Sequence, residues 1–217
     1  GNRKRYIMFL HKDFHETFDV TEPEDNSRYY KGITSALGSQ PEKVASLMEW
    51  RRRVGEEEAN RIMRSSSQHG KQVHSLIESY IKNEDITQLS VMPNVMETFN
   101  SIRHIIDQSI SEVLLQEHNL HSNKYQLKGR LDCLAMILDK LSVIDFKTSM
   151  KPKKREWVHD YMLQTSAYSH MIHEMYGVKI DQVVVMISVI EGGHPQIFTG
   201  DPDKYILDPF FKARLAA

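Results

Sequence analysis

The sequence contains very little cysteine and no long apolar run. Its only cysteine in 217 residues is Cys133, which excludes an intrachain disulfide framework and a four-cysteine metal cluster. No apolar stretch approaches the ~20 residues of a membrane-spanning helix, so we expect no membrane partner. Residues 1–5, G-N-R-K-R, are basic but are not followed by an apolar h-region of the ~7–15 residues that a signal peptide has, which argues against one. Together these absences favour an intracellular protein in a reducing compartment.

The chain also has almost no net charge, and it has no internal repeats or low-complexity tracts. Its 28 lysines and arginines against 29 acids give a net charge of −1, so a polyanionic partner would have to meet a local basic patch. With 40% hydrophobic and 26% charged residues, the composition is that of an ordinary globular protein. Since no linker is evident, we expect one domain over residues 1–217, with a helical part at about 30–110 and a core at about 111–217.

Helical signals dominate the first half of the chain and strand signals the second. This distribution predicts an α/β fold, a central mixed sheet flanked by helices, with one helix crossing between strands. Residues 22–27 are predicted to form a loop. Helices are predicted at 41–54, 56–65, 67–83, from 93 to about 106, 158–176 and 208–215, and strands at 6–10, 113–118, 125–138, 141–148, 182–190 and 196–199.

The segment 129–149, G-R-L-D-C-L-A-M-I-L-D-K-L-S-V-I-D-F-K-T-S, carries charged residues inside an apolar hairpin. A two-residue turn at Asp139 and Lys140 would place Asp132 opposite Lys147. Because side chains alternate along a strand, Asp132, Asp145 and Lys147 would then emerge on one face. Burying three charges costs several kcal/mol unless something compensates, and a divalent metal would do so.

This hairpin also has a simpler interpretation. An aspartate and the lysine could form a salt bridge on a sheet, while the second aspartate is solvated. The register is also sensitive to the turn, because a three-residue loop would move Asp132 to the other face. In the predicted register Leu134 faces Asp145 and Leu138 faces Leu141.

Two further ionisable residues could join the hairpin. His74 lies on the 67–83 helix, with Gly70 one turn before it, so that a substrate backbone could approach there. Glu117 ends an apolar strand immediately before the hairpin. Taken alone, His74 is more typical of a structural histidine and Glu117 of an exposed acid at a strand end.

Other residues are compatible with nucleic acid binding. Gln164 and Tyr168 share one helix face at i and i+4. Four cations directly follow the strand that carries Lys147, where a phosphate backbone could pass, although such runs are often only solvated. Trp50 with Arg51 and the two arginines after it offer an aromatic and cationic patch suited to single strands. The cations of the run are Lys151, Lys153, Lys154 and Arg155.

The order His, Glu, Gly-x-x-Asp, Asp-x-Lys, Gln-x-x-x-Tyr resembles that of the PD-(D/E)XK nucleases, in particular the RecB-like exonuclease branch. V-I-D-F-K-T-S-M-K-P-K and G-R-L-D-C look similar to segments of the mitochondrial genome maintenance exonucleases and their phage-encoded relatives. The resemblance extends over approximately residues 30–199. It implies a restriction-endonuclease-like core, a central mixed sheet flanked by helices.

The resemblance also implies roles for individual residues. His74, Asp132, Asp145 and the backbone carbonyl of Phe146 would bind one or two Mg²⁺ or Mn²⁺ ions, with Glu117 as a supporting acid. Lys147 would orient or activate the attacking water, and Gln164 and Tyr168 would contact DNA. The sequence departs from the family name because Leu131 stands where the proline would be, and it has no cysteines for an iron–sulfur cluster.

The function implied by this resemblance is a metal-dependent DNA exonuclease that prefers single-stranded ends and serves replication, recombination or repair. A phage-infected bacterial cytoplasm or a mitochondrial matrix would suit such an enzyme. Three other classes stay open: a structure-specific endonuclease or resolvase, a non-catalytic DNA-binding module, and a structural or interaction protein. Cleavage polarity and oligomeric state are not set by the sequence.

Overall fold

A computed structural model describes residues 7–8, 12–18, 20–191 and 193–215 of the chain. The basic residues 1–5 lie outside this part, and of the strand predicted at 6–10 only Ile7–Met8 falls within it. The elements are β1 (Ile7–Met8), α1 (Lys12–Phe18), η1 (Ser27–Tyr29), β2 (Lys31–Gly32), α2 (Ile33–Gly38), α3 (Pro41–Val54), α4 (Glu56–Ile81), η2 (Ile86–Gln88), α5 (Pro93–Ser109), β3 (Ile110–Ser122), β4 (Leu127–Ile137), β5 (Lys140–Ser149), η3 (Arg155–Val158), α6 (His159–Tyr176), β6 (Gln182–Val189), β7 (Gln196–Gly200), α7 (Pro202–Tyr205) and α8 (Pro209–Leu215).

The strands form one mixed sheet, which confirms the predicted fold class. Their order is β1-β3-β4-β5-β6-β7, and β2 pairs with β4 off this path. The β3–β4, β4–β5 and β6–β7 pairs are antiparallel, whereas β5 and β6 run parallel. Helix α6 makes the crossover between β5 and β6, as predicted, and ends at Gly177 in a left-handed conformation (φ 71°).

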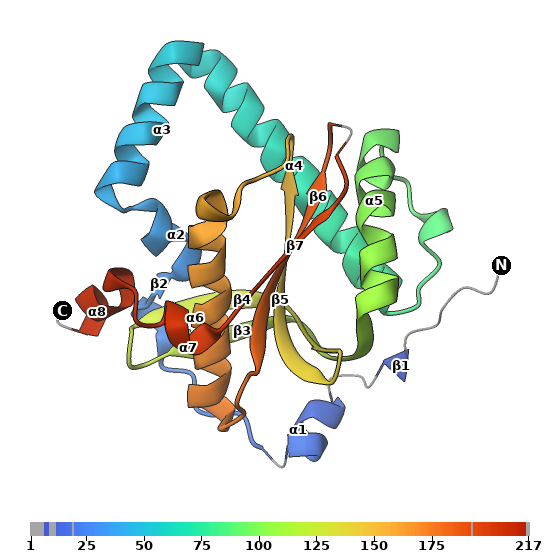
Figure 1. The fold of residues 1–217 in the computed structure, drawn as a ribbon, viewed down its shortest axis with the longest axis vertical. Coiled ribbons are helices and arrows are strands. Elements are labelled where there is room, and N and C mark those ends of the chain that lie inside the picture. Colours follow the sequence, from blue (N-terminus) through green and yellow to red (C-terminus); the bar gives the residue numbers. More distant parts are fainter. Residues whose placement is uncertain (1–6, 9–11, 19, 192, 216–217) are drawn as a thin grey trace.

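Two apolar cores lie on the two faces of this sheet (Figure 1). On one face, α6 packs against alternate residues such as Val143 of β5 and Val183 of β6. On the other face, α4 and α5 cover Ile144 and Val184, the next residue of each strand. The sheet is therefore buried on both sides, as its nearly continuous apolar strands predict.

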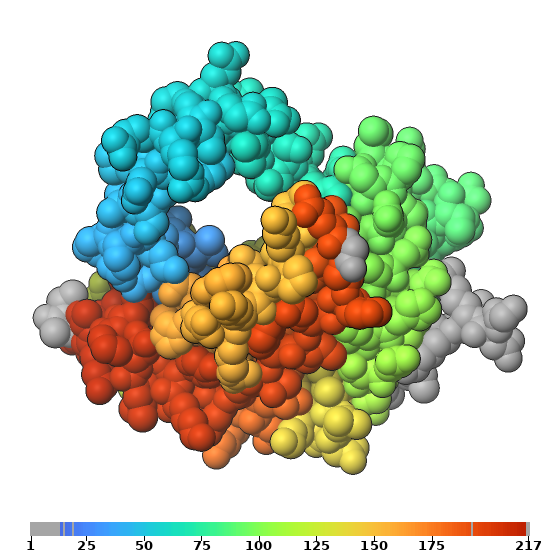
Figure 2. Space-filling model, turned by 45° about the horizontal axis from the view of Figure 1, so that its top comes forward, coloured from blue at the N-terminus to red at the C-terminus, as the bar shows by residue number. Residues whose placement is uncertain are grey.

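Helix α3 and the first half of α4 project from the sheet as an arm, whereas the second half of α4 packs on the sheet. The prediction of separate helices at 56–65 and 67–83 is wrong, because α4 runs unbroken through residue 66. Gly55, at φ 90°, makes the bend between the two helices, a conformation that glycine adopts without steric cost. Figure 2 shows an open passage beneath this arm, bounded below by residues of the segment that follows β5. Lys43 of α3 reaches Asp160 of α6 at 3.0 Å and ties the arm to the core.

The hairpin turn lies one residue earlier than predicted. Leu138 and Asp139 form it, with φ values of 47° and 61°, and Leu141 pairs with Met136 rather than with Leu138. Leu134 pairs with Val143, not with Asp145. Turn propensity is a local preference, whereas the register here is fixed by five cross-strand pairs and by the packing of β4 against β3. The two-residue loop is preserved, so over the five paired positions the shift changes partners but keeps the alternation of side chains.

Candidate metal centre and active site

The candidate site lies where β4 and β5 separate. Their ladder ends at the pair Cys133–Ile144. Beyond this pair β4 continues alongside β3 as far as Leu127, and β5 continues alongside β6 as far as Ser149. We call the resulting gap, between residues 127–132 and residues 145–149, the fork. Asp132 and Asp145 lie at its apex, immediately after the last paired residues.

The α4 side of the fork contributes His74. Its Nε2 lies 2.7 Å from the carbonyl oxygen of Phe146, and its Nδ1 lies 3.5 Å from Oδ1 of Asp132. The other carboxylate oxygen of Asp132 accepts a hydrogen bond of 2.8 Å from the backbone N–H of Phe146. One aspartate side chain therefore replaces the backbone pairing that the open ladder no longer provides, and it joins α4 to both strands.

The α6 side of the fork contributes a lysine held by two oxygens. Lys147 Nζ lies 3.0 Å from Oδ2 of Asp145 and donates a 3.0 Å hydrogen bond to Oε1 of Gln164. The ring of Tyr161 lies 5.0 Å from the same ammonium group. The position of Lys147 is thus fixed from both β5 and α6.

Gln164 links this lysine to two further side chains. Its Nε2 donates to the hydroxyl of Thr34 on α2 (3.2 Å) and to that of Tyr168 (3.1 Å). Tyr168 packs directly over Gly129, where an added Cβ would approach its ring carbon to 2.6 Å. The predicted pair Gln164 and Tyr168 therefore lies at the site, with Gly129 providing the space for the tyrosine ring.

Glu117 enters the site from β3, opposite the break in the ladder. It lies between the β3–β4 pairs Gln116–Cys133 and His118–Leu131, and its φ of 48° is unusual for a residue other than glycine. Backbone strain of this kind concentrates at functional sites. One oxygen of its carboxylate lies 3.0 Å from Nε of Arg130.

The charges of the site interact strongly. Burial alone would lower the pKa of His74, but the hydrogen bond and charge of Asp132, together with Asp145, raise it to about 9. The pKa of Asp132 is lowered in spite of burial, because His74 stabilises its charged form. Burial raises the pKa of Asp145 to about 7, with Asp132 adding to the effect and Lys147 opposing it. Burial and the charge of Asp132 also raise the pKa of Glu117. Asp132 thus raises the proton affinity of His74, Asp145 and Glu117 together.

Comparison with known proteins assigns residues 27–199 to the PD-(D/E)XK nuclease superfamily. The chain belongs to this superfamily. It is also similar to mitochondrial genome maintenance exonuclease 1 from three vertebrates: it is 32% identical to the Mus musculus protein over 165 residues, 26% to the Xenopus tropicalis protein over 170 and 27% to the Homo sapiens protein over 171. These matches cover 71%, 75% and 74% of this chain but only 48%, 48% and 49% of the relatives, so it matches about half their length. A solved structure titled "Crystal structure of SSO0001" covers 96% of the chain, and the chain covers 84% of that structure, with 15% identity and a TM-score of 0.43.

PD-(D/E)XK nucleases use divalent metals, and the residues of this chain fit one. His74, Glu117 and Asp132 each offer a ligand atom within 4.8 Å of the others. Asp145 is 2% exposed, and its Oδ2 accepts no hydrogen bond of normal geometry from a described residue. In the structure this buried oxygen faces the Lys147 ammonium group at 3.0 Å, and a bound metal ion would be a further cationic partner for it. Oxygen ligands with one imidazole suit Mg²⁺ or Mn²⁺. The choice of Mg²⁺ or Mn²⁺ stays a prediction. The same holds for Asp145 and the carbonyl of Phe146 as further ligands.

The arrangement suits hydrolysis of a phosphodiester. A bound divalent cation would polarise the phosphate and lower the pKa of a water molecule beside it. Lys147 is held by Asp145 and Gln164, and in a phosphodiesterase site it would place positive charge where the transition state gains negative charge. Because Gln164 and Tyr168 anchor this lysine to α6, its ammonium group is oriented before any substrate arrives.

The hollow at the fork includes most of the predicted site residues. Its lining includes His74, Asp132, Asp145, Lys147, Gln164 and Tyr168. Glu117 lines the two neighbouring hollows instead.

The predicted cationic residues lie outside this hollow. Lys153 is close to it, since it shares the ring of Tyr161 with Lys147. Arg155 donates to the Thr199 carbonyl, and Arg51 binds Glu56 across the bend of the arm. A role in binding DNA stays a prediction for all of the residues proposed from the sequence. These are Lys151, Lys153, Lys154, Arg155, Arg51 and Trp50.

Sequence reasoning overlooked Thr34 and Arg130. Thr34 lies 130 positions from Gln164 along the chain, and no local pattern connects the two. Arg130 stands two residues before Asp132 in the motif itself, so its position on the same strand could have drawn attention to it.

Proposed function

We propose that this chain is a divalent-metal-dependent DNA exonuclease that acts on single-stranded ends. His74, Asp132 and Asp145 would bind the cation together with the carbonyl of Phe146, Glu117 would support it, and Lys147 would stabilise the transition state. Membership of a nuclease superfamily and the names of the curated relatives support the activity.

The proposed preference for single-stranded ends rests on the open passage beneath α3 and α4. Thr34 of α2, before the arm along the chain, and His74 of α4, after its projecting part, both line the hollow at the fork, so the arm begins and ends beside the site. The ion pair between Lys43 and Asp160 ties the arm to α6, and Figure 2 shows the opening that remains. A free strand end could thread such an opening, whereas a closed circle could not enter it without the arm releasing the core.

The test compares linear and circular single-stranded DNA of the same sequence, with a blunt duplex as a third substrate. We expect digestion of the linear strand in Mg²⁺ or Mn²⁺ and at least about tenfold slower loss of the circle and the duplex, because neither presents a single-stranded end. Comparable rates on linear and circular DNA would refute exonuclease action and favour an endonuclease or resolvase. DNA binding without cleavage of any substrate would indicate a non-catalytic module.

Within the described ranges, none of the helices is long and apolar enough to cross a bilayer.

A further inference from the structure

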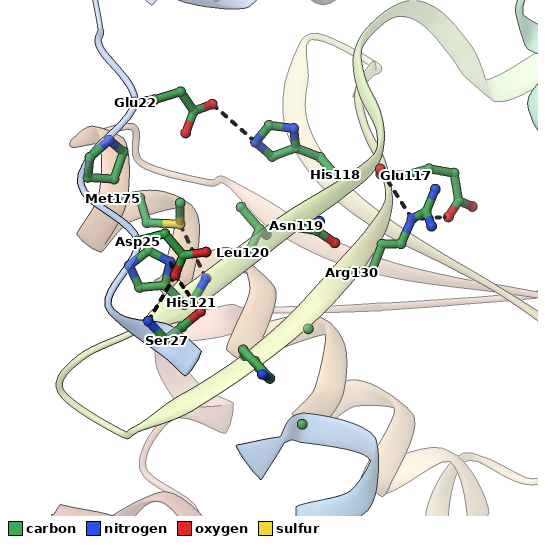
Figure 3. Close-up of a pocket in the computed structure, with 14 residues that line it drawn as sticks. Glu22, Asp25, Ser27, Glu117, His118, Asn119, Leu120, His121, Arg130 and Met175 are labelled. Atoms are coloured by element: carbon green, nitrogen blue, oxygen red, sulfur yellow. Dashed lines mark hydrogen bonds and ion pairs between the residues drawn. The ribbon is translucent and has the colours of Figure 1, made fainter. Parts of the chain in front are cut away.

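Arg130 occupies the junction of three hollows on the surface. It lines the hollow at the fork, a second hollow against α4 that includes Gly70 and Lys71, and a third beside β3 that includes His118 and His121. Figure 3 shows the third hollow, with Arg130 and Glu117 joined at one side and Glu22, His118 and His121 farther along β3 and the segment before β2. A chain passing from the fork into either neighbour would pass this guanidinium group.

The guanidinium of Arg130 is only partly engaged. Nε lies 3.0 Å from the carboxylate of Glu117 and donates a hydrogen bond of 3.2 Å to the Glu117 carbonyl. Its two terminal nitrogens have no hydrogen-bond partner among the described residues, and 61% of the side chain surface is exposed. Glu117 therefore holds the inner edge of the group while the outer edge, with its paired donors, faces solvent. A guanidinium fork binds phosphate through two parallel hydrogen bonds, and it stays charged at any working pH.

Lys128 extends this cationic edge along the same strand. It stands two residues before Arg130 on β4, and the regular pairs from His118–Leu131 to Ser122–Leu127 keep the two side chains on one face. Lys128 lines both the fork and the third hollow, and among the described residues its ammonium group donates one hydrogen bond, a long one of 3.4 Å to the carbonyl of Arg28. The face that reaches Asp132 at the apex of the fork thus begins with two positive charges.

The basic run after β5 lies on the other branch of the fork. Lys153 reaches the site from that side through the ring of Tyr161, next to Lys147. The β4 branch carries Lys128 and Arg130 as its own cations. A strand crossing the apex would therefore meet positive charge on each side of the scissile phosphate.

We propose that Arg130 and Lys128 bind substrate phosphates on the β4 side of the scissile bond. This inference rests on the proposed function, since it assigns a binding track to the same site. The ligand class is a single-stranded oligonucleotide, recognised through its backbone and not its sequence.

The test measures binding of a fluorescent oligothymidylate in EDTA over a series of salt concentrations. For single strands, the slope of log K against log salt changes by about 0.7 for each phosphate contact. We expect Arg130→Gln and Lys128→Gln each to reduce the slope by about that amount, and the double variant by about 1.4. Lys140→Gln, which removes an exposed charge at the far end of the same hairpin, serves as the matched control and should leave the slope unchanged.

Steady-state cleavage in Mn²⁺ separates binding from a bracing role. Loss of phosphate contacts should raise KM severalfold with kcat nearly unchanged, whereas loss of the brace on Glu117 would lower kcat and leave the salt slope as in the wild type. The second pattern would overturn the proposal. If the wild type neither binds nor cleaves single strands, the proposed function itself is wrong. If the wild type binds them but the salt slope is unaltered in the two variants, only the phosphate-binding role of Arg130 and Lys128 is wrong.

Discussion

At the scale of single residues, the site is a cluster of charges whose proton affinities depend on one another. His74 holds a proton because Asp132 stabilises it, and Asp145 tends to keep one because burial disfavours its charged form. Metal ligands must be deprotonated, so a cation that binds here has to displace both protons. Metal affinity and pH are therefore linked in this chain.

The linkage predicts how metal stabilises the fold. Both pKa values are raised above their ordinary values, to about 9 for His74 and about 7 for Asp145. Their protonated forms thus stabilise the metal-free protein at low pH, and this contribution is lost as pH rises through 7 and then 9. Saturating Mn²⁺ should add about 2.7 kcal/mol at 100 times its Kd, or roughly 5–10 °C in Tm, at pH 8. The same Mn²⁺ concentration at pH 6 should give a clearly smaller shift.

The shift in Tm is measured by thermal unfolding with and without Mn²⁺ at pH 6 and pH 8. Asp145→Asn should lose most of the shift. Asp139→Asn changes the same residue type at the exposed turn of the same hairpin and should keep it. A shift that is equal at pH 6 and pH 8, or is retained in Asp145→Asn, would contradict this linkage.

At the scale of elements, the arm is held more weakly than the core. None of the residues of α3 is buried, whereas α6 buries residues along most of its length. Local opening costs little where few apolar contacts are lost. Backbone amides of α3 should therefore exchange with solvent at least about tenfold faster than those of α6.

Hydrogen exchange followed by mass spectrometry would measure this difference. Adding a single-stranded oligonucleotide should slow exchange in α3 and the first turns of α4, if the strand passes beneath them. Helix α8, at the end of the described chain, provides an internal reference. Exchange in α3 that matches α6, or that does not respond to the oligonucleotide, would argue against the threading account.

The hairpin shows which features local sequence patterns predict and which they do not. Alternation correctly predicted two strands joined by a two-residue loop, but it misplaced the turn by one residue, because Leu138 is a poor choice for a left-handed position. Packing of β4 against β3 and the capping of Phe146 by Asp132 decide the register, and both depend on contacts distant in sequence. In the same way, α4 appeared as two helices because its polar middle, around residue 66, buries nothing and gives no apolar periodicity.

At the scale of the whole molecule, the fold class and most of the site were predictable, and the surfaces around the site were not. The residues that line the fork share ordered motifs, whereas the arm, its tie from Lys43 to Asp160 and the hollow beside β3 arise only when distant segments meet. His74 and Gln164 approach the fork from opposite faces of the sheet. The position of the site at the point where β4 and β5 part explains why both layers can reach it.

The most direct test of the central claim is cleavage of end-labelled linear single-stranded DNA by the wild type, Asp145→Asn and Lys147→Ala, with Asp139→Asn as control. We predict cleavage by the wild type and the control in Mg²⁺ or Mn²⁺ but not in EDTA. Each site variant should lose at least about 10²-fold in rate while DNA binding is largely retained. Full activity in either purified site variant, or metal-independent cleavage by the wild type, would contradict the assignment of this site.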